Sequence, residues 1–483
     1  MTLAHDSATA LAARIRSKEI SSRELTELYI RRIEKYDTAV NAVVVRDFER
    51  ALEAAERADA AVAAGEPLGP LHGIPMTIKE AYDVEGLPTT WGIPAFAENI
   101  ATSDADSVRR LRRAGAHFLG KTNVPIQLGD FQSYNEIYGT TSNPWNLERT
   151  PGGSSGGSSA ALAAGLCALE SGSDIGGSIR NPAHFCGVYG HKPTWGVVPD
   201  QGHALPGMLA SPDIAVVGPL ARSAEDLAVA MDIVSGADAF NERGWTLGLP
   251  RPAQRSLADF RVAVWPSDSV CPVSRAVADR VQALADRLAG LGATVSDSAR
   301  PAFDPADSHR IYTTMLNGPM SAGVPDDVFA KLSEAARGFD PADRSDAVES
   351  IRATVQPHRE WVRQCNRRAA LRQAWNAFFE DWDILLCPQM PTTAFRHDHS
   401  PFAARTVQVD GAEQNYLRQV FWAGLITVAY LPSTVFPTGT AADGLPIGIQ
   451  AAGREFDDYT CIEFTRLIAQ EIGGFEPPAG YES

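Results

Sequence analysis

The sequence has few cysteines, and they are not arranged in pairs. No two of the six follow the C-x-x-C spacing of zinc sites and redox motifs: Cys167, Cys186, Cys271, Cys365, Cys387 and Cys461. A disulfide framework needs a dense set of cysteines and belongs to oxidising compartments. We therefore expect no disulfide framework, no zinc site and a cytoplasmic location.

Long apolar runs and an excess of positive charge are also missing. No segment approaches the run of about 18 apolar residues that suggests a membrane span. The start, MTLAHDSATALAARIRSKE, has the pattern of an amphipathic helix rather than of a signal peptide. With 43 Lys and Arg against 59 Asp and Glu, the net charge is -16, which disfavours nucleic acid and anionic lipid as partners. A neutral or weakly charged small molecule is the expected partner.

The composition is that of a soluble globular protein, with 44% hydrophobic and 21% charged residues. The length of 483 residues suggests two or three domains. Beyond Trp195, apolar β-rich segments bounded by Pro or Gly alternate with helical patterns, which predicts an α/β sandwich with helices on both faces of a sheet. Residues from about 304 to 376 are instead helical and charged. They form either a lid-like segment of a substrate pocket or a helical surface subdomain.

A glycine- and serine-rich stretch, RTPGGSSGGSSAALAAG, runs from Arg149 to Gly165. A flexible linker would have polar sequence on both sides, whereas this stretch enters an alanine-rich segment that predicts a buried helix over residues 158–172. Ser155 is the centre of a formal G-x-S-x-G match, the nucleophile elbow of α/β-hydrolases, with His397 or His399 as its base. That elbow requires a preceding strand, and NPWNLERTP has no strand pattern.

A second glycine loop, SDIGGSIR, offers a better nucleophile. Ile175, Gly176 and Gly177 can present successive N–H groups beside Ser178, as acyl transfer requires for its oxyanion. A glycine turn with a helix-capping serine is the alternative. The base need not be histidine, because a lysine serves where burial lowers its pKa. Lys79, in the strand-like run MTIKEAYDV, is the candidate base, unless it points to solvent as most strand lysines do.

Six segments, in the same order, resemble the amidase signature family: LHGIPMTIKEAYDVEG, GKTNVP, NPWN, TPGGSSGGS, GSDIGGSIRNPAHFCGVYGHKPT and GLPIGIQ. The strongest block covers residues 71–199, and weaker segments extend it over most of the chain. The resemblance implies one α/β/α domain with a mixed central sheet over residues 1–483, in place of the two or three domains that length suggests. It also implies amide hydrolysis without a metal or a cofactor.

By the same resemblance, Ser178 is the nucleophile, Lys79 is the base and Ser154 passes protons between them. Ser155 hydrogen-bonds around the lysine, and the N–H groups of residues 175–178 form the oxyanion hole. The peptide bond before Ser154 is expected to be cis. This arrangement suits amide hydrolysis, because an amine is a poor leaving group unless it is protonated as the C–N bond breaks.

Three further residues complete the expected site. Asp174 and Arg180 flank the nucleophile loop and brace it, with an ordinary surface ion pair as the alternative. The resemblance to the fatty acid amide hydrolases implies that a backbone carbonyl at Leu128 lines the active site.

Two departures from related subclasses favour a stand-alone soluble amidase. Glutamine-dependent transamidase subunits carry a serine-leucine-aspartate segment where this chain has ASPDIAVVGPLARS, and they act with partner subunits and tRNA. Membrane-bound fatty acid amide hydrolases have an N-terminal membrane segment, which we do not expect here. A homodimer would be unsurprising, although no feature of the sequence demonstrates one.

The substrate class depends on bulky residues of the helical segment. If they face the cleft, an aryl or bulky acyl amide, anilide or carbamate is expected, and packing in the core is the alternative. These residues are Tyr312, Met315, Met320, Phe329, Phe339 and Trp361.

Overall fold

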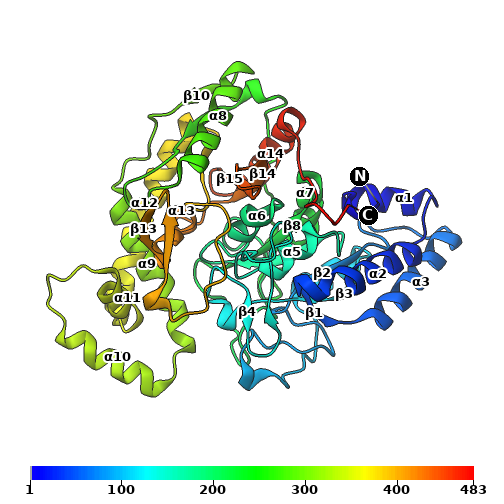
Figure 1. Ribbon diagram of the computed structural model, residues 1–483, viewed down its shortest axis with the longest axis horizontal. Coiled ribbons are helices and arrows are strands. Elements are labelled where there is room, and N and C mark those ends of the chain that lie inside the picture. Colours follow the sequence, from blue (N-terminus) through cyan, green and yellow to red (C-terminus); the bar gives the residue numbers. More distant parts are fainter. Residues whose placement is uncertain (1–2, 483) are drawn as a thin grey trace.

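A mixed sheet of eight strands forms the centre of the protein (Figure 1). The computed structural model describes residues 3–482. Strands β10, β9 and β11 run parallel to one another, and the other neighbouring pairs are antiparallel. In sheet order, the strands are β10 (Thr294–Ser296), β9 (Arg261–Val264), β11 (Ile384–Pro388), β15 (Pro446–Ala452), β14 (Ser433–Thr440), β7 (Tyr189–Lys192), β8 (Val216–Ala221) and β6 (Glu170–Asp174).

Helices cover both faces of this sheet. On one face, α6 (Arg180–Cys186) packs on β14 and β15, and Val435 of β14 lies on that side. Successive side chains of a strand point to opposite faces, so Phe436 points away from α6, and its ring contacts Phe464 of α14 (Asp458–Ile472). The predicted α/β sandwich with helices on both faces is therefore confirmed.

A smaller sheet, in the order β1-β3-β2, carries the predicted base. The N–H of Thr77 in β2 donates to the carbonyl of Leu169 at 3.3 Å, so β2 lies against the chain that leads into β6. Lys79, the last residue of β2, is thereby brought beside β6. The strands outside the large sheet are β1 (Val43–Arg46), β2 (Pro75–Lys79), β3 (His117–Thr122), and the hairpins β4 (Tyr134–Asn135) with β5 (Gly139–Thr140) and β12 (Thr406–Val409) with β13 (Ala412–Asn415).

Of the helices that the structure describes, none combines the length and the apolar character that a membrane span requires. The remaining α-helices are α1 (Ala8–Arg16), α2 (Ser22–Val40), α3 (Phe48–Ala64), α4 (Asp106–Arg113), α5 (Gly156–Ala163), α7 (Ala224–Val234), α8 (Arg275–Gly290), α9 (Pro305–Met320), α10 (Asp326–Gly338), α11 (Asp346–Thr354), α12 (His358–Asp381) and α13 (Phe421–Thr427). Short 3-10 turns are η1 (Leu3–His5), η2 (Pro94–Phe96), η3 (Ile126–Leu128), η4 (Leu257–Asp259), η5 (Ser321–Gly323), η6 (Phe402–Ala404) and η7 (Tyr416–Val420).

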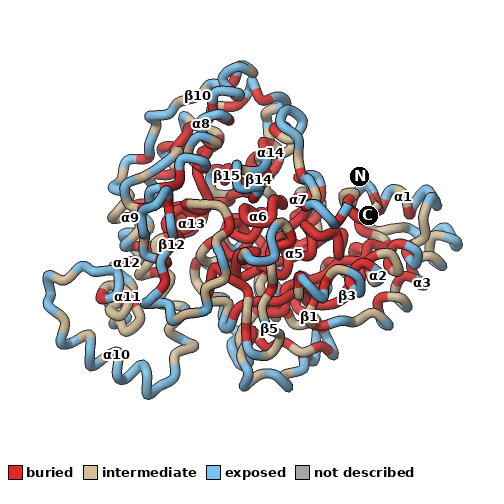
Figure 2. The backbone as a smooth tube through the Cα atoms, in the orientation of Figure 1, coloured by how far each residue is buried: buried red, intermediate tan, exposed pale blue. Residues whose placement is uncertain are grey.

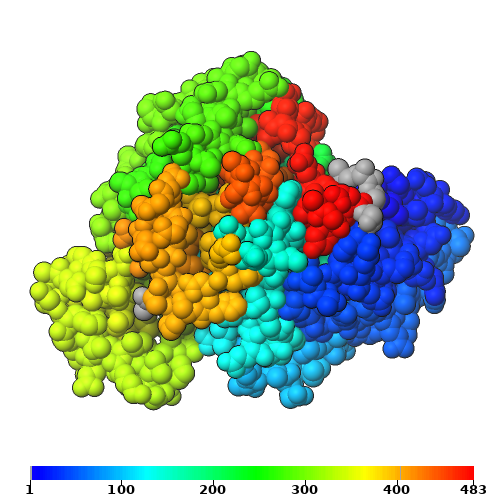
Figure 3. Space-filling model, in the orientation of Figure 1, coloured from blue at the N-terminus to red at the C-terminus, as the bar shows by residue number. Residues whose placement is uncertain are grey.

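The segment predicted to be helical, residues 304–376, contains α9, α10, α11 and most of α12. It forms a lobe at the edge of the molecule, yellow-green in Figure 3. Its helices differ in burial, as Figure 2 shows: α9 contributes Ile311 and Met315 to the hydrophobic core, whereas α10 buries no residue. The segment is thus anchored by α9 and exposed around α10.

Helix α5 is shorter than the sequence predicts. It ends at Ala163 and is soon followed by Gly165, whose φ of 65° is a conformation that favours glycine. The predicted helix was therefore wrong for residues 164–172, of which 170–172 belong to β6 and pair with β8. All eight residues of α5 are buried. Its Gly157 lies so close to the end of β3 that a Cβ atom there would be 2.4 Å from the backbone nitrogen of Asn123.

This close approach predicts an inverted effect of replacing glycine by alanine in a helix. Alanine normally stabilises a helix relative to glycine, but Gly157→Ala should lower the melting temperature because the methyl group meets backbone atoms that cannot move aside. The matched control is Gly290→Ala at the end of α8, where a Cβ atom meets nothing within 4 Å. Thermal unfolding followed by circular dichroism should show a clear loss for the first variant and no loss for the second. Equal melting temperatures would contradict the close packing of α5.

Candidate active site

Lys79 is completely buried, and three serine hydroxyls surround its amine. Its Nζ atom lies 2.7 Å from Ser154 Oγ, 2.9 Å from Ser155 Oγ and 2.9 Å from Ser173 Oγ. Ser154 and Ser155 come from the loop before α5, and Ser173 comes from β6. The structure therefore brings Lys79 together with the two loop serines that the sequence predicts around it. The alternative that the Lys79 side chain points to solvent is therefore wrong.

Burial changes the acidity of this amine. Removal from water lowers the pKa of Lys79 to about 7, against the smaller opposing effects of the negative charges on Asp174 and Glu170. Among the described residues, no carboxylate forms an ion pair with Lys79. The side chain is thus neutral in a large fraction of molecules at neutral pH, and a neutral amine has a lone pair that accepts a proton.

Two hydrogen bonds tie the loop of Ser154 to the loop of Ser178. On one side of Ser154, the N–H of Gly153 donates to Asn181 Oδ1 at 2.9 Å. On the other side, the N–H of Ser155 donates to the carbonyl of Ser178 at 3.0 Å. The peptide bond between Gly153 and Ser154 is cis, as the resemblance implies. Ser154 is therefore held from both sides against the segment that carries Ser178.

The loop from Ile175 to Ser178 follows β6 directly. Ser178 is 8% exposed and precedes α6 closely. The N–H of Gly177 donates to Asp174 Oδ1 at 2.8 Å, so this amide is already engaged within the protein. Within residues 3–482, the N–H groups of Ile175, Gly176 and Ser178 have no hydrogen-bond partner. Of the four N–H groups predicted to form the oxyanion hole, these three therefore remain free to bind an oxyanion.

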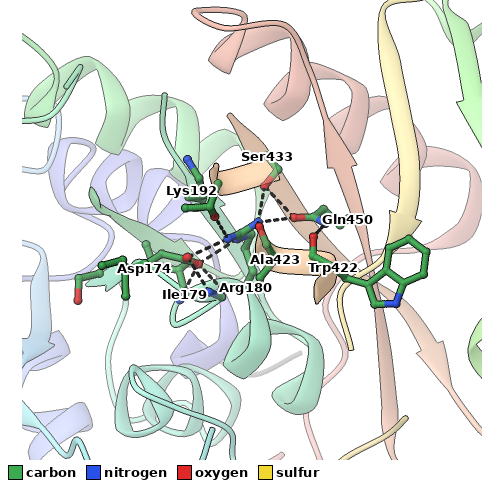
Figure 4. A network of polar contacts seen from close by, with 12 residues as sticks. Asp174, Ile179, Arg180, Lys192, Trp422, Ala423, Ser433 and Gln450 are labelled. Atoms are coloured by element: carbon green, nitrogen blue, oxygen red, sulfur yellow. Dashed lines mark hydrogen bonds and ion pairs between the residues drawn. The ribbon is translucent and has the colours of Figure 1, made fainter. Parts of the chain in front are cut away.

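Asp174 and Arg180 form a bidentate ion pair that is 0% exposed at both side chains (Figure 4). Arg180 also donates to Gln450 Oε1 at 2.6 Å and to Thr427 Oγ1 at 2.7 Å. Burial alone would raise the pKa of Asp174, but the charge and hydrogen bonds of Arg180, with smaller contributions from the charge of Lys192 and the Gly177 N–H, lower it to about 2. The alternative of an ordinary surface ion pair is wrong, and the pair braces the loop from within the core.

A cavity of about 470 Å³ opens beside these loops. Helix α9 and the chain around η3 and η7 supply much of its remaining wall. No group of three or more His, Cys, Asp or Glu side chains in the described part of the chain is arranged to hold a metal ion. Of the predicted binding residues, Gly177 does not line the cavity. The other five do: Leu128, Ser154, Ile175, Gly176 and Ser178.

The bulky residues of the helical segment mostly do not reach this cavity. Tyr312 and Met315 are completely buried, and Trp361 packs against Gly318 of α9. Of the six residues named from the sequence, Met320 alone lines the cavity. Core packing is therefore the fate of Tyr312 and Met315, and the apolar character of the cavity comes from other side chains such as Leu316.

The α/β-hydrolase alternative fails on geometry. No strand leads into Ser155, whose hydroxyl is buried and contacts Lys79. The ring of His399 stacks on Tyr134 with centroids 3.8 Å apart. Neither His397 nor His399 lines the cavity. Ser155 thus has no histidine base.

Sequence reasoning missed Ser173 and Asn181. Ser173 lies two residues after Ser171 in β6, and strand alternation places both on one side, where Ser171 Oγ lies 2.9 Å from Tyr82 Oη. A strand prediction for residues 170–174 would have placed Ser173 on the same face as Ser171, whereas its contact with Lys79 depends on how β2 packs against β6. Asn181 carries no local signal, because its contact with Gly153 depends on how the two loops pack.

Comparisons with known proteins agree with one another. A family model described as Amidase matches residues 24–462. The chain is 34% identical to an acylamidase of Rhodococcus erythropolis, covering 94% of this chain and 92% of that protein. It is 33% identical to one component of the glutamyl-tRNA(Gln) amidotransferase of Moorella thermoacetica, covering 97% of each. A bacterial aryl acylamidase of the amidase signature family has a similar structure, with a TM-score of 0.82, 25% identity, and coverage of 97% of this chain and 96% of that one.

The buried ion pair predicts a large loss of stability when one partner is removed. Arg180→Leu leaves the Asp174 carboxylate buried without its countercharge, which should cost about 3–5 kcal/mol in the free energy of unfolding. The matched control is Arg396→Leu, which breaks an ion pair with Glu148 whose side chains are 69% and 67% exposed; it should cost less than about 1 kcal/mol. Urea unfolding measures both losses. Similar losses in the two variants would show that the Asp174–Arg180 pair does not brace the core.

Proposed function

Because the chain belongs to the amidase signature family, we propose that it hydrolyses the C–N bond of small amides through an acyl-enzyme on Ser178. The observation that carries this proposal is the contact of Lys79 Nζ with Ser154 Oγ at 2.7 Å, in a buried site that lowers the pKa of the lysine. Ser154 and Ser178 line the same cavity. The relay and the nucleophile therefore face one cavity, and the base contacts the relay from behind it.

In the first half of the reaction, Ser178 Oγ attacks the carbonyl carbon of the amide. Its proton passes to Ser154 Oγ while the proton of Ser154 passes to the lone pair of neutral Lys79. The amine of Lys79 keeps its two other contacts as a donor, to Ser155 and Ser173. The carbonyl oxygen gains negative charge, which the free N–H groups of the 175–178 loop stabilise.

The same relay then runs in reverse to release the amine. Lys79 returns its proton through Ser154 to the amide nitrogen, the C–N bond breaks and a neutral amine leaves. A water molecule next attacks the ester on Ser178. Its proton passes to Ser154 Oγ while the proton of Ser154 passes to Lys79. Collapse of that intermediate returns the proton to Ser178 Oγ and releases the carboxylic acid.

We propose an aryl or bulky acyl amide, anilide or carbamate as the substrate. Two ion pairs lie at the cavity: Arg418 is 2.8 Å from Asp346, and Arg344 is 3.1 Å from Glu349. An uncharged substrate therefore displaces no ion pair, and the helical segment 304–376 forms part of its pocket through α9. The similar fold of a bacterial aryl acylamidase supports an aryl group.

Amide transfer within a glutamyl-tRNA(Gln) amidotransferase is the second candidate, since the Moorella relative is a component of such an enzyme. The two functions differ in what the purified chain does alone. A stand-alone amidase releases amine from a panel of acyl anilides, primary amides, carbamates and esters, with products identified by mass. A transferase component needs partner chains, and an inactive chain that co-purifies with other proteins would favour it.

The proposed roles predict which substitutions abolish turnover. Ser178→Ala should reduce kcat by about 10³-fold or more, and Lys79→Met should do nearly the same, because nucleophile and base act as one unit. A fluorophosphonate probe should label the wild-type chain at Ser178 and should not label Ser178→Ala.

The control for this prediction is the double variant His397→Ala/His399→Ala, whose histidines lie away from the cavity. Circular dichroism verifies that each variant is folded. Full turnover in Ser178→Ala, or loss of labelling in the histidine variant, would contradict the assignment.

The acidity of Lys79 predicts the pH dependence of the reaction. The base must be neutral, and its pKa in the folded protein is lowered to about 7. The value of kcat/KM should therefore rise with pH through a midpoint near 7 and level off above it. Steady-state rates measured from about two pH units below this midpoint to about two pH units above it determine its value.

Glu170→Gln tests whether Lys79 is the titrating group, because burial also raises the pKa of Glu170 to about 7. The negative charge of Glu170 favours the protonated lysine, so removing it should move the midpoint to lower pH. If the rise of kcat/KM with pH disappears in Glu170→Gln, the titrating group is Glu170 and the assignment to Lys79 is wrong.

A further inference from the structure

Helix α9 places a tyrosine behind the loop that carries the proposed oxyanion hole. Tyr312 is completely buried and does not line the cavity. Its hydroxyl donates to the carbonyl of Ile175 at 2.9 Å. The contact joins the helical segment 304–376 to residues far earlier in the chain, and the proposed reaction mechanism does not use it.

This hydrogen bond sets the orientation of one peptide group. In a planar trans peptide, the C=O of one residue and the N–H of the next point in opposite directions. Because the carbonyl of Ile175 points to Tyr312, the N–H of Gly176 points away from it, and Gly176 lines the cavity. On the following peptide, Asp174 accepts the N–H of Gly177 and fixes that group as well. Two contacts therefore orient successive peptides of the loop.

The Tyr312 side chain is closely packed both along its ring and at its hydroxyl. A Cβ atom on Gly424 of α13 would lie 2.4 Å from Tyr312 Cδ1, and one on Gly176 would lie 3.2 Å from Tyr312 Oη. Burial raises the pKa of Tyr312, so its hydroxyl keeps the proton that it donates. The ring thus reaches Ile175 between two glycines, with little room to turn.

We propose that Tyr312 is the positioning residue of the oxyanion hole, holding the Ile175–Gly176 peptide so that the Gly176 N–H faces the substrate carbonyl. This inference rests on the proposed function of the Ser178 loop. Helix α9 also lines the cavity, through His309 and Leu316, which lie one turn before and one turn after Tyr312, and through Thr313. One helix therefore contacts the substrate and aligns the amide that stabilises its transition state.

Tyr312→Phe removes the hydroxyl and keeps the ring. A lost oxyanion donor costs about 10²–10³ in kcat, so a misaligned one should lower kcat by about 10-fold, with KM changed less than about 2-fold. The affinity for phenylboronic acid, which forms a tetrahedral adduct with a serine, should fall by the same factor as kcat. The matched control is Tyr29→Phe, whose buried hydroxyl also donates to a backbone carbonyl, that of Ala4 at 3.2 Å, outside the cavity. It should lower the melting temperature and leave kcat and boronate affinity unchanged.

Wild-type kcat and boronate affinity in a folded Tyr312→Phe protein would overturn the proposal. So would an equal loss of kcat in Tyr29→Phe, since both effects would then follow from general destabilisation. If Tyr312→Phe does not fold, Gly424→Ala decides instead: its methyl group displaces the ring, which should reduce kcat and boronate affinity together, and wild-type values would overturn the proposal. Failure of the proposed function is distinct, because it appears as full turnover in Ser178→Ala.

Discussion

The site depends on the burial of the Lys79 amine without a carboxylate as its ion-pair partner. Lys79 is surrounded by three hydroxyls, which satisfy its hydrogen bonds but supply no countercharge. A buried ammonium without an ion-pair partner is strongly disfavoured, so the amine loses its proton near neutral pH. Meeting that condition requires three separate segments to converge: β2 from the small sheet, the loop before α5, and β6 at the edge of the large sheet. The packing of the two sheets against each other is thus what makes the lysine a base.

Glycine allows this convergence through close approach rather than flexibility. A Cβ atom on Gly153 would lie 2.3 Å from the carbonyl oxygen of Asp130, and one on Gly172 would lie 2.7 Å from Ser155 Oγ. Both positions are buried. The stretch that resembles a linker in composition is therefore closely packed at Gly153, and the absence of a side chain at Gly172 of β6 leaves room for the Ser155 hydroxyl that contacts Lys79.

The parts of the site predicted from the sequence are those encoded by short local patterns. Lys79, Ser154 and Ser178 stand in motifs whose neighbours determine their loops, and the sandwich follows from alternating helix and strand patterns. The parts that were missed depend on distant packing. Gln450 meets Arg180 only because β15 and α6 are neighbours in space, and Tyr312 meets Ile175 only because α9 returns to the sheet. The length of α5 was overestimated because neither the left-handed turn at Gly165 nor the pairing of β6 with β8 is visible locally.

The ion pair of Asp174 and Arg180 also bears on the acidity of Lys79. An isolated carboxylate near the lysine would stabilise the ammonium and raise its pKa toward the value of an exposed side chain. Here Arg180 and the backbone N–H groups of Gly177 and Ile179 hold the charge of Asp174. The carboxylate of Asp174 therefore orders the nucleophile loop, and its charge raises the pKa of Lys79 by less than burial lowers it. The contacts that shape the loop and those that keep the lysine neutral are, in this respect, the same contacts.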